Sequence, residues 1–344
     1  MVAVSSNQSA AAPPAPDCLA PLVVILGPTA SGKSALALSL AERFGGEVVA
    51  CDSTQVYRGF DIGTAKPSPA ERHGIPHHLI DIVEPSAVFT AGEYRRQALI
   101  VLADLRVRGR LPILTAGTGL YLRALLEGLA DAPERSEALR SRLQESAARR
   151  GGPEYLHRML RRLDPVAAAR ISRNDGQKLI RALEICLLAG RPVTDLYRAG
   201  RAPLEGYTIL KLGLNPSRAE LYERIGRRVQ QMLDRGWLDE VAALVRNGTP
   251  LSAKPFEFLG YRELRDHFAQ GVSSPPSPEV IEAIAQDTRR YAKRQFTWFR
   301  KEPGVLWLAG FGDDENVIKA AVSAVETQFP SFAAGRPARS SQLA

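Results

Sequence analysis

Residues 27–34 read G-P-T-A-S-G-K-S and match the phosphate-loop pattern G-x-x-x-x-G-K-[ST]. A short apolar run at 22–26 (L-V-V-I-L) precedes the motif, and a segment with apolar residues at helical spacing, 35–44, follows it. Such a strand–loop–helix unit turns backbone N–H groups and the positive end of a helix toward one point, where phosphate oxygens bind. The motif therefore predicts a parallel α/β sheet that handles a phosphorylated ligand. The alternative is a glycine-rich turn that binds nothing.

The polar residues of the loop have distinct expected roles. Lys33 supplies a point charge for phosphate oxygens, and the Ser34 hydroxyl is placed to ligate Mg²⁺. Gly27 and Gly32 let the backbone curl around the anion.

Composition indicates an ordinary soluble enzyme with a basic balance. A chain of 344 residues is too long for a single small hydrophobic core, so two domains are expected. The net charge of +8 favours a polyanionic partner. Three scattered cysteines exclude a disulfide framework and suit a reducing cytoplasm. No apolar run is long enough to span a membrane. Both ends, 1–21 and 331–344, are predicted to be disordered tails.

Asp52 follows a second strand-like run, 47–51 (E-V-V-A-C). In a parallel α/β sheet, ligands bind in the crevice at the carboxyl ends of the strands. Asp52 could therefore be a general base, a magnesium ligand through water, or the N-cap of the next segment. The residues alone leave these three roles open.

Alternating strands and helices continue to about residue 129. A capped helix is predicted at 90–108 and a buried strand at 111–115, which delivers Thr118 at its carboxyl end. His77 and His78 are adjacent in a strand-like patch and would point to opposite faces, so packing or hydrogen bonding is favoured over a shared metal. This order predicts a doubly wound, P-loop NTPase-like core.

The segment 130–203 is predicted to be an inserted all-helical domain. Between Glu134 and Arg201 it carries fifteen Lys or Arg against eight Asp or Glu, which is +7 of the chain's +8. Solvated helix faces usually explain such charge, but beside a phosphate-handling core it indicates a nucleic-acid backbone surface. Gln177, Lys178 and Arg181 share one broad helix face there.

The core is expected to resume at 204–312, with a C-terminal helix at 313–330. A strand is predicted at 207–214 and an amphipathic helix at 218–235, on which Arg224 and Arg228 share a face. Residues 287–301 hold six basic side chains against one acidic, with aromatic residues interleaved. That mixture can stack bases and neutralise phosphates, although Phe296 and Phe299 are assigned to the core.

Seven strings in order resemble the tRNA dimethylallyltransferase family, the bacterial isopentenyl-tRNA transferases. The resemblance runs from Leu22 to about Leu308. The strings are G-P-T-A-S-G-K-S (27–34), D-S-T-Q-V-Y (52–57), D-I-G-T-A-K-P (61–67), H-H-L-I-D-I (77–82), G-T-G-L-Y (117–121), L-G-Y-R-E (259–263) and K-R-Q-F-T-W (293–298).

The resemblance implies transfer of a dimethylallyl group from its diphosphate to the N6 amine of the adenosine 3′-adjacent to the anticodon in tRNA. Lys33 and Mg²⁺ on Ser34 would neutralise the leaving diphosphate, with Thr29 and Arg228 as further contacts. Asp52 would accept the amine proton, which favours general base among its three roles. The basic insert would grip the anticodon stem-loop by shape and phosphates.

The resemblance also assigns site residues. Those for the diphosphate are Gly27, Pro28, Thr29, Ala30, Ser31, Gly32, Lys33, Ser34 and Arg228. Those for tRNA are Asp52, Ser53, Thr54, Gln55, Thr118, Arg140, Gln177, Lys178, Leu179, Ile180, Arg181, Gly260, Tyr261, Arg262, Lys293, Arg294, Gln295 and Trp298.

Departures from the family pattern are small. Ala116 stands where many relatives have glycine, and Ser34 stands where threonine is commoner. The absence of cysteine after Cys186 excludes the zinc finger of eukaryotic relatives.

The protein is expected to be a monomer in the cytoplasm. The alternatives are an adenylate isopentenyltransferase that acts on free AMP, ADP or ATP, and a P-loop small-molecule kinase. A phosphate loop accepts either kind of diphosphate, ATP included.

Overall fold

The computed structural model describes residues 19–198, 200–269 and 275–333. The chain forms two compact units, one made of residues 1–123 with 205–344 and the other of residues 124–204. Each is described below by itself. No helix in these described ranges is long and apolar enough to cross a membrane.

The larger unit is built on a six-stranded parallel sheet in the order β3-β2-β4-β1-β5-β6. The strands are β1 (Ala20–Leu26), β2 (Glu47–Cys51), β3 (His77–His78), β4 (Pro112–Ala116), β5 (Tyr207–Leu214) and β6 (Val305–Leu308). The central strand β1 is apolar throughout and fully buried from Leu22 to Leu26, as expected for a parallel strand covered on both faces.

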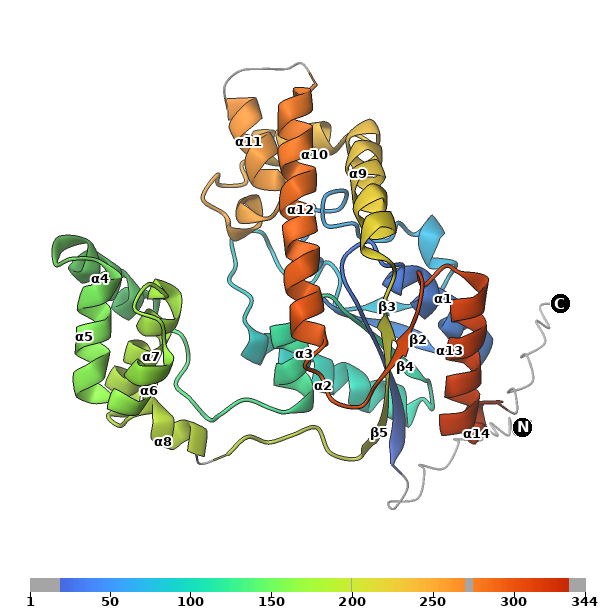
Figure 1. The fold of residues 1–344 in the computed structure, drawn as a ribbon, viewed down its shortest axis with the longest axis horizontal. Helices are drawn as coiled ribbons and strands as arrows, with labels where there is room; N and C mark the ends of the chain where they lie inside the picture. Colours follow the sequence, from blue (N-terminus) through green and yellow to red (C-terminus); the bar gives the residue numbers. More distant parts are fainter. Residues whose placement is uncertain (1–18, 199, 270–274, 334–344) are drawn as a thin grey trace, which may run out of the picture. The chain divides into compact units, whose positions relative to one another are not determined.

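Helices cover both faces of this sheet (Figure 1). On one side α1 (Lys33–Phe44), α13 (Glu315–Gln328) and α14 (Pro330–Ala333) pack on the strands through a core that includes Val23, Ile25, Leu36 and Leu212. On the other side lie α2 (Ala91–Val107) and α3 (Gly119–Leu126). Thr90 caps α2 by accepting from the Glu93 N–H, as predicted.

A second helical group rises beyond the carboxyl ends of the strands (Figure 1). It consists of α9 (Arg218–Asp234), α10 (Trp237–Arg246), α11 (Tyr261–Ala269) and α12 (Pro278–Phe299), with 3₁₀ turns at Lys254–Glu257 and, earlier in the chain, Ala70–Arg72. Its core joins Phe60, Trp237, Phe256 and Tyr261. Helices from the second half of the chain therefore cover the loops that follow β2 and β4.

Helices are the regular elements of the smaller unit, and no strand occurs among its described residues. It contains α4 (Glu137–Arg149), α5 (Pro153–Leu163), α6 (Pro165–Arg170), α7 (Gly176–Ala189) and α8 (Val193–Arg198). Its own core includes Leu156, Leu160, Leu179 and Leu183. Its bounds are 124–204, against the expected 130–203, and the last residues of α3 belong to it.

The predicted elements need few corrections. The strands at 47–51 and 207–214 have the predicted bounds, and the helix at 218–235 ends one residue earlier. The predicted disordered tails, 1–21 and 331–344, were each a few residues too long: β1 starts at Ala20, and α14 extends to Ala333. The rest of both predicted tails, 1–18 and 334–344, lies outside the described residues. The short edge strand β6 was not predicted.

Candidate active site

The phosphate loop connects β1 to α1, so it opens at the carboxyl end of the central strand. Ala30 and Gly32 have positive φ angles of 63° and 87°, which curl the backbone around a central point. At Gly32 a Cβ would lie 2.6 Å from the backbone nitrogen of Gly312, so only glycine permits this close approach. The geometry is that of an anion-binding loop at a helix N-terminus.

Lys33 lies over the loop. Its Nζ donates to the carbonyls of Gly27 (2.9 Å) and Pro28 (2.8 Å). The side chain lines a cavity and keeps some exposed surface, but surrounding protein atoms desolvate the ammonium and lower its pKa to about 8. The nearby Asp52 opposes this shift and Arg228 adds to it. An anion bound in the loop would favour the charged lysine.

This pKa predicts a pH dependence of diphosphate binding. Below pH 8 Lys33 is charged before the anion arrives, whereas above pH 8 binding must take up a proton. Affinity for inorganic diphosphate should therefore fall above pH 8, by up to about tenfold per pH unit. Calorimetry measures the affinity for diphosphate as a function of pH in the wild type and in Lys33→Met. The ligand's own titration affects both proteins equally, so the difference between their pH profiles reports on Lys33. Parallel pH profiles for the two proteins would contradict it.

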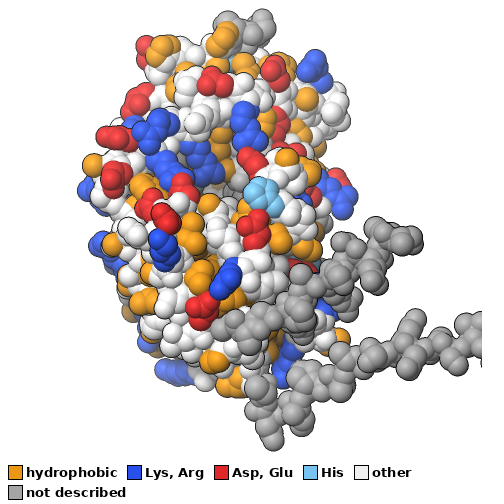
Figure 2. Space-filling view, turned by 90° about the vertical axis from the view of Figure 1, so that its right-hand side faces the viewer, with side chains coloured by type: hydrophobic (Ala, Val, Ile, Leu, Met, Phe, Trp, Pro, Cys, Tyr) orange, Lys and Arg blue, Asp and Glu red, His pale blue; other side chains and the backbone are white. Residues whose placement is uncertain are grey.

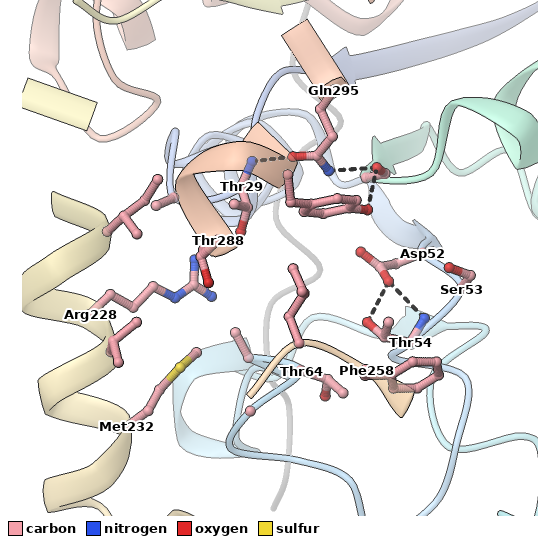
Figure 3. Close-up of a pocket in the computed structure, with 18 of the residues that line it drawn as sticks. Thr29, Asp52, Ser53, Thr54, Thr64, Arg228, Met232, Phe258, Thr288 and Gln295 are labelled. Atoms are coloured by element: carbon pink, nitrogen blue, oxygen red, sulfur yellow. Dashed lines mark hydrogen bonds between the residues drawn. The ribbon is translucent and has the colours of Figure 1, made fainter. Parts of the chain in front are cut away.

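Arg228 approaches the loop from the opposite wall. It projects from α9 toward Thr29 and Thr288 (Figure 3). Burial, together with the neighbouring Arg224, lowers the pKa of Arg228, so this guanidinium sits where a negative charge would compensate it. Lys33 and Arg228 thus face the same space with two positive charges.

Asp52 stands at the end of β2, across the cavity from Arg228 (Figure 3). Its Oδ1 accepts from the Thr54 N–H (2.8 Å) and from the Thr54 hydroxyl (2.6 Å). The other oxygen is turned toward the cavity and lies against Gly117. No helix begins after Asp52, so the N-cap role is wrong; the residue closes a turn and presents a carboxylate oxygen to the cavity.

The contact with Gly117 predicts that a single methyl group will disturb Asp52. A Cβ at position 117 would lie 2.4 Å from Oδ2 of Asp52, so Gly117→Ala must push the carboxylate aside. We expect turnover to fall about 10²-fold with little loss of folding stability, because misplacing a reacting group by about 1 Å costs that much. The matched control is Gly226→Ala on α9, where a Cβ would meet nothing. Unchanged turnover in Gly117→Ala would show that the position of this carboxylate is unimportant.

A cavity of about 350 Å³ lies between the phosphate loop and Asp52. Thr29, Lys33 and Arg228 line its polar end. Apolar side chains from α9, α10 and the turn before α11 form part of its remaining wall: Ile225, Val229, Met232, Trp237, Phe258 and Leu259. Polar side chains, including Thr288, Tyr291 and Arg294 of α12, line the rest. The cavity therefore suits a ligand that joins an anionic head to a short apolar group, held next to a carboxylate.

A wider cleft of about 1000 Å³ adjoins this cavity and shares Lys33, Asp52 and Arg228 with it. Arg224, Arg227 and Arg235 of α9 line the cleft. Arg224 is bound by both oxygens of Asp313 at 2.8 and 2.9 Å. One face of the molecule shows Lys and Arg side chains gathered in its upper half, with acidic side chains between them (Figure 2). The phosphate loop thus opens into a basic cleft.

Ser34 has the surroundings that a single-ligand magnesium site requires. Its side chain is exposed, lines the wider cleft, and makes no hydrogen bond to any described residue. Within the described ranges, no three His, Cys, Asp or Glu side chains are grouped to hold a metal. A metal here would therefore depend on oxygens of the ligand itself, which is how Mg²⁺ is held with phosphate groups.

The loop at 61–66 forms another wall and is fixed by buried polar contacts. The Lys66 ammonium, with its side chain 3% exposed, bonds Asp61 and Asp81. The Gly63 N–H donates to the hydroxyl of Tyr261 (3.0 Å), which donates to Glu240 (2.6 Å). Residues 63–65 of this loop therefore line the cavity, in a position fixed by these contacts.

Three residues of the larger unit that were predicted to bind tRNA are buried. Tyr261 is fully buried, and Gly260 packs against the Trp237 ring because a Cβ there would clash with it. Gln295 is 7% exposed and hydrogen-bonds two loops of the site. Tyr261 and Gly260 pack within the helical group beyond the sheet, and Gln295 lines the cavity beside Asp52.

The other predicted residues of this unit divide into loop contacts and exposed side chains. The Thr118 hydroxyl accepts from the Ser53 N–H (3.0 Å), and Gln55 donates to the carbonyls of Thr64 and Ala65. Arg262 is paired with Glu263. Lys293 and Arg294 are exposed, and Trp298 is partly exposed beneath the guanidinium of Arg123.

In the helical unit the predicted face of α7 is only partly available. Leu179 and Ile180 are buried in its core, so their side chains are not exposed on that face. Gln177 and Lys178 are exposed. Arg140 and Arg181 both donate to Glu184, whose side chain is fully buried. Burial raises the pKa of this carboxyl group, but the hydrogen bonds from the two arginines lower it, and the net shift is downward.

Sequence reasoning missed the apolar wall and Tyr291. Met232 and Val229 lie on one face of a helix that was predicted for its arginines, and Phe258 follows a 3₁₀ turn without a motif of its own. Tyr291 reaches the carbonyl of Gly117 (3.4 Å), and burial together with Asp52 raises its pKa. Nothing in the local pattern distinguishes such residues from ordinary core residues.

His77 and His78 make the hydrogen bonds that were favoured over a metal. His77 Nδ1 contacts the Ile75 carbonyl (2.9 Å), and His78 Nε2 contacts Glu47 (2.8 Å).

Comparison with known proteins gives one consistent result. Residues 55–302 match the family model described as IPP transferase. The tRNA dimethylallyltransferase of Koribacter versatilis is 51% identical over 306 residues, which cover 89% of this chain and 98% of the relative.

Solved structures agree with the fold. The tRNA isopentenylpyrophosphate transferase of Bacillus halodurans superposes with a TM-score of 0.65 at 37% identity, covering 91% of this chain and 98% of that one. A eukaryotic dimethylallyltransferase acting on tRNA gives a TM-score of 0.73 at 27% identity, covering 91% and 77%. The chain therefore belongs to the IPP transferase family, with the tRNA dimethylallyltransferases as its relatives.

Proposed function

We propose that this chain transfers a dimethylallyl group from dimethylallyl diphosphate to N6 of the adenosine 3′-adjacent to the anticodon in tRNA, and releases diphosphate. One observation carries the proposal. A single cavity is lined by the phosphate loop with Lys33 and Arg228, by apolar side chains that include Val229, Met232 and Phe258, and by Asp52, which lies across from Arg228. The donor has matching parts, because it joins a diphosphate to a short apolar group.

In the reaction, the phosphate loop, Lys33 and Arg228 hold the diphosphate, with Thr29 beside them. The N6 nitrogen attacks C1 of the dimethylallyl group, a C–N bond forms, and the C1–O bond breaks with its electron pair on the diphosphate. The two cations stabilise the charge that develops there. Oδ2 of Asp52 accepts the N6 proton as the bond forms, while Thr54 holds Oδ1 in place.

Mg²⁺ fits the polar end of this site. When bound with the donor it would supply further positive charge to the leaving diphosphate. The Ser34 hydroxyl would be its protein ligand, since that hydroxyl is exposed beside the loop and has no other described partner.

A tRNA acceptor is favoured over a free nucleotide by the helical unit. It concentrates most of the net positive charge of the chain in a segment that takes no part in the donor cavity. Exposed Gln177 and Lys178 would contribute to gripping the anticodon stem-loop, and the adenosine would leave its stack to reach Asp52. We propose that the enzyme acts as a monomer in the cytoplasm, where its substrate resides.

The proposal is tested on the donor side by offering dimethylallyl diphosphate or ATP, each with Mg²⁺ and unmodified tRNA. We expect labelled prenyl groups in the RNA and no consumption of ATP. Phosphoryl transfer from ATP without prenylation would instead identify a P-loop kinase.

The apolar side chains of the cavity are expected to set the selectivity of the enzyme for the length of the prenyl group. Met232 projects into the cavity from α9 (Figure 3), so Met232→Ala should lengthen the space available to the prenyl group. We expect the preference for dimethylallyl over geranyl diphosphate, as a ratio of kcat/KM, to fall by about 10-fold, the usual discrimination of an apolar pocket against a small change in size. An unchanged ratio would show that Met232 does not limit the donor.

A further inference from the structure

One buried side chain connects the two halves of the site. Gln295 of α12 is 7% exposed. Its Oε1 accepts from the Thr29 N–H at 2.7 Å, and its Nε2 donates to the Gly117 carbonyl at 2.7 Å (Figure 3). These two partners lie 266 and 178 residues away in the sequence. The strands that lead into these loops, β1 and β4, are paired as far as Leu26 and Ala116, and the amide adds a side-chain link between the loops beyond the ends of the strands.

The two loops carry the two ends of the reaction. Thr29 belongs to the phosphate loop that holds the donor. Gly117 is the surface against which the Asp52 carboxylate lies, since a Cβ there would be 2.4 Å from Oδ2. Tyr291, one turn earlier on α12, also reaches the Gly117 carbonyl, at 3.4 Å. Any shift of the Gly117 loop relative to Thr29 changes the distance between the donor and the base.

The amide of Gln295 satisfies both partners at once. Thr29 presents an N–H, which needs an acceptor, and Gly117 presents a carbonyl, which needs a donor; buried backbone groups are costly to leave unpaired. A carboxylate keeps the acceptor but places an oxygen against the Gly117 carbonyl. A thioether of similar length fills the space and satisfies neither partner.

We propose that Gln295 is a positioning residue that fixes the phosphate loop relative to Asp52 and thereby sets the attack geometry. It acts through Thr29 and Gly117, and it does not contact tRNA. The inference rests on the proposed function, because it assigns the donor to one loop and the base to the other.

The test compares Gln295→Met and Gln295→Glu with the wild type. Their matched controls are Gln286→Met and Gln286→Glu, which make the same changes at an exposed position of the same helix. With both substrates varied, we expect kcat to fall about 10²-fold in both Gln295 variants, the usual cost of misplacing reacting groups by about 1 Å. The KM for tRNA should stay within about twofold of the wild-type value, since no tRNA contact is lost.

Two kinetic outcomes would overturn the inference. If both Gln295 variants keep kcat within about threefold of wild type, the bridge does not position anything. If the loss appears as a raised KM for tRNA at unchanged kcat, Gln295 is an RNA contact. Should Gln295→Met fail to fold by circular dichroism, the nearly isosteric Gln295→Glu decides alone.

A separate measurement distinguishes failure of the proposed function. If the wild type transfers no prenyl group, the proposed function fails, and the bridge is judged from binding of inorganic diphosphate with Mg²⁺. Weakening by about fivefold in Gln295→Met, which removes the acceptor of the Thr29 N–H without adding a charge, supports a role in holding the phosphate loop. Equal binding by the variant and the wild type overturns it.

Discussion

Replacing Asp52 with asparagine is expected to lower kcat for prenyl transfer about 10³-fold, within the range that a general base contributes. Asparagine keeps an oxygen that can accept from Thr54, so the turn at 52–54 should persist. The oxygen that faces the cavity becomes an amide nitrogen that cannot accept a proton. The defect should lie in the chemical step, and single-turnover kinetics at saturating tRNA and donor measure it.

The control for this change is Asp239→Asn, which removes an exposed carboxylate on α10. Binding of tRNA to Asp52→Asn should remain within about threefold of wild type, because binding common to ground and transition states is retained. Turnover retained in Asp52→Asn would mean that another group accepts the proton.

Replacing Lys33 with methionine is expected to reduce kcat/KM for the donor about 10³-fold. The ammonium lies on the phosphate loop, held by the carbonyls of Gly27 and Pro28, where the charge on the departing diphosphate develops. Electrostatic groups in such a position contribute about 10²–10³ in rate, and loss of ground-state binding adds to this. Steady-state kinetics with the donor varied at saturating tRNA measure the effect.

Lys319→Met is the matched control, because Lys319 is exposed on α13 and forms a surface ion pair with Glu315. The KM for tRNA in Lys33→Met should be unchanged. If instead the loss falls on tRNA and leaves the donor unaffected, the phosphate loop is not the donor site.

The fold and the two ends of the site follow from local sequence. The phosphate loop combines a fixed spacing with a preceding strand and a following helix, and each has its own physical reason. Asp52 could be placed because the carboxyl end of every parallel strand in a sheet lies at the same edge. The helical unit could be recognised from its charge and from its lack of strand patterns.

The positions of some site residues depend on long-range packing, so the sequence could not predict them. Gln295 sits in a string that is rich in Lys and Arg, so its neighbours suggested RNA contact, yet the turn of α12 places it inside, against two distant loops. Tyr261 and Leu179 were assigned to tRNA by their position in a motif, but both are fully buried. A motif identifies residues that matter, and only the tertiary structure separates ligand contacts from wall-building residues.

The edge strand β6 shows a limit of a different kind. Val305–Leu308 pairs only with β5, is four residues long, and keeps Leu306 exposed. Short edge strands carry little periodicity, and their pairing depends on a partner far away in the sequence.

The most direct measurement offers labelled dimethylallyl diphosphate and Mg²⁺ with two acceptors side by side: unmodified tRNA that has an adenosine 3′-adjacent to its anticodon, and free AMP. The account predicts label in tRNA alone, at N6 of that adenosine. Label in AMP alone would contradict it, because the donor site would then serve a free nucleotide and the basic helical unit would need another explanation.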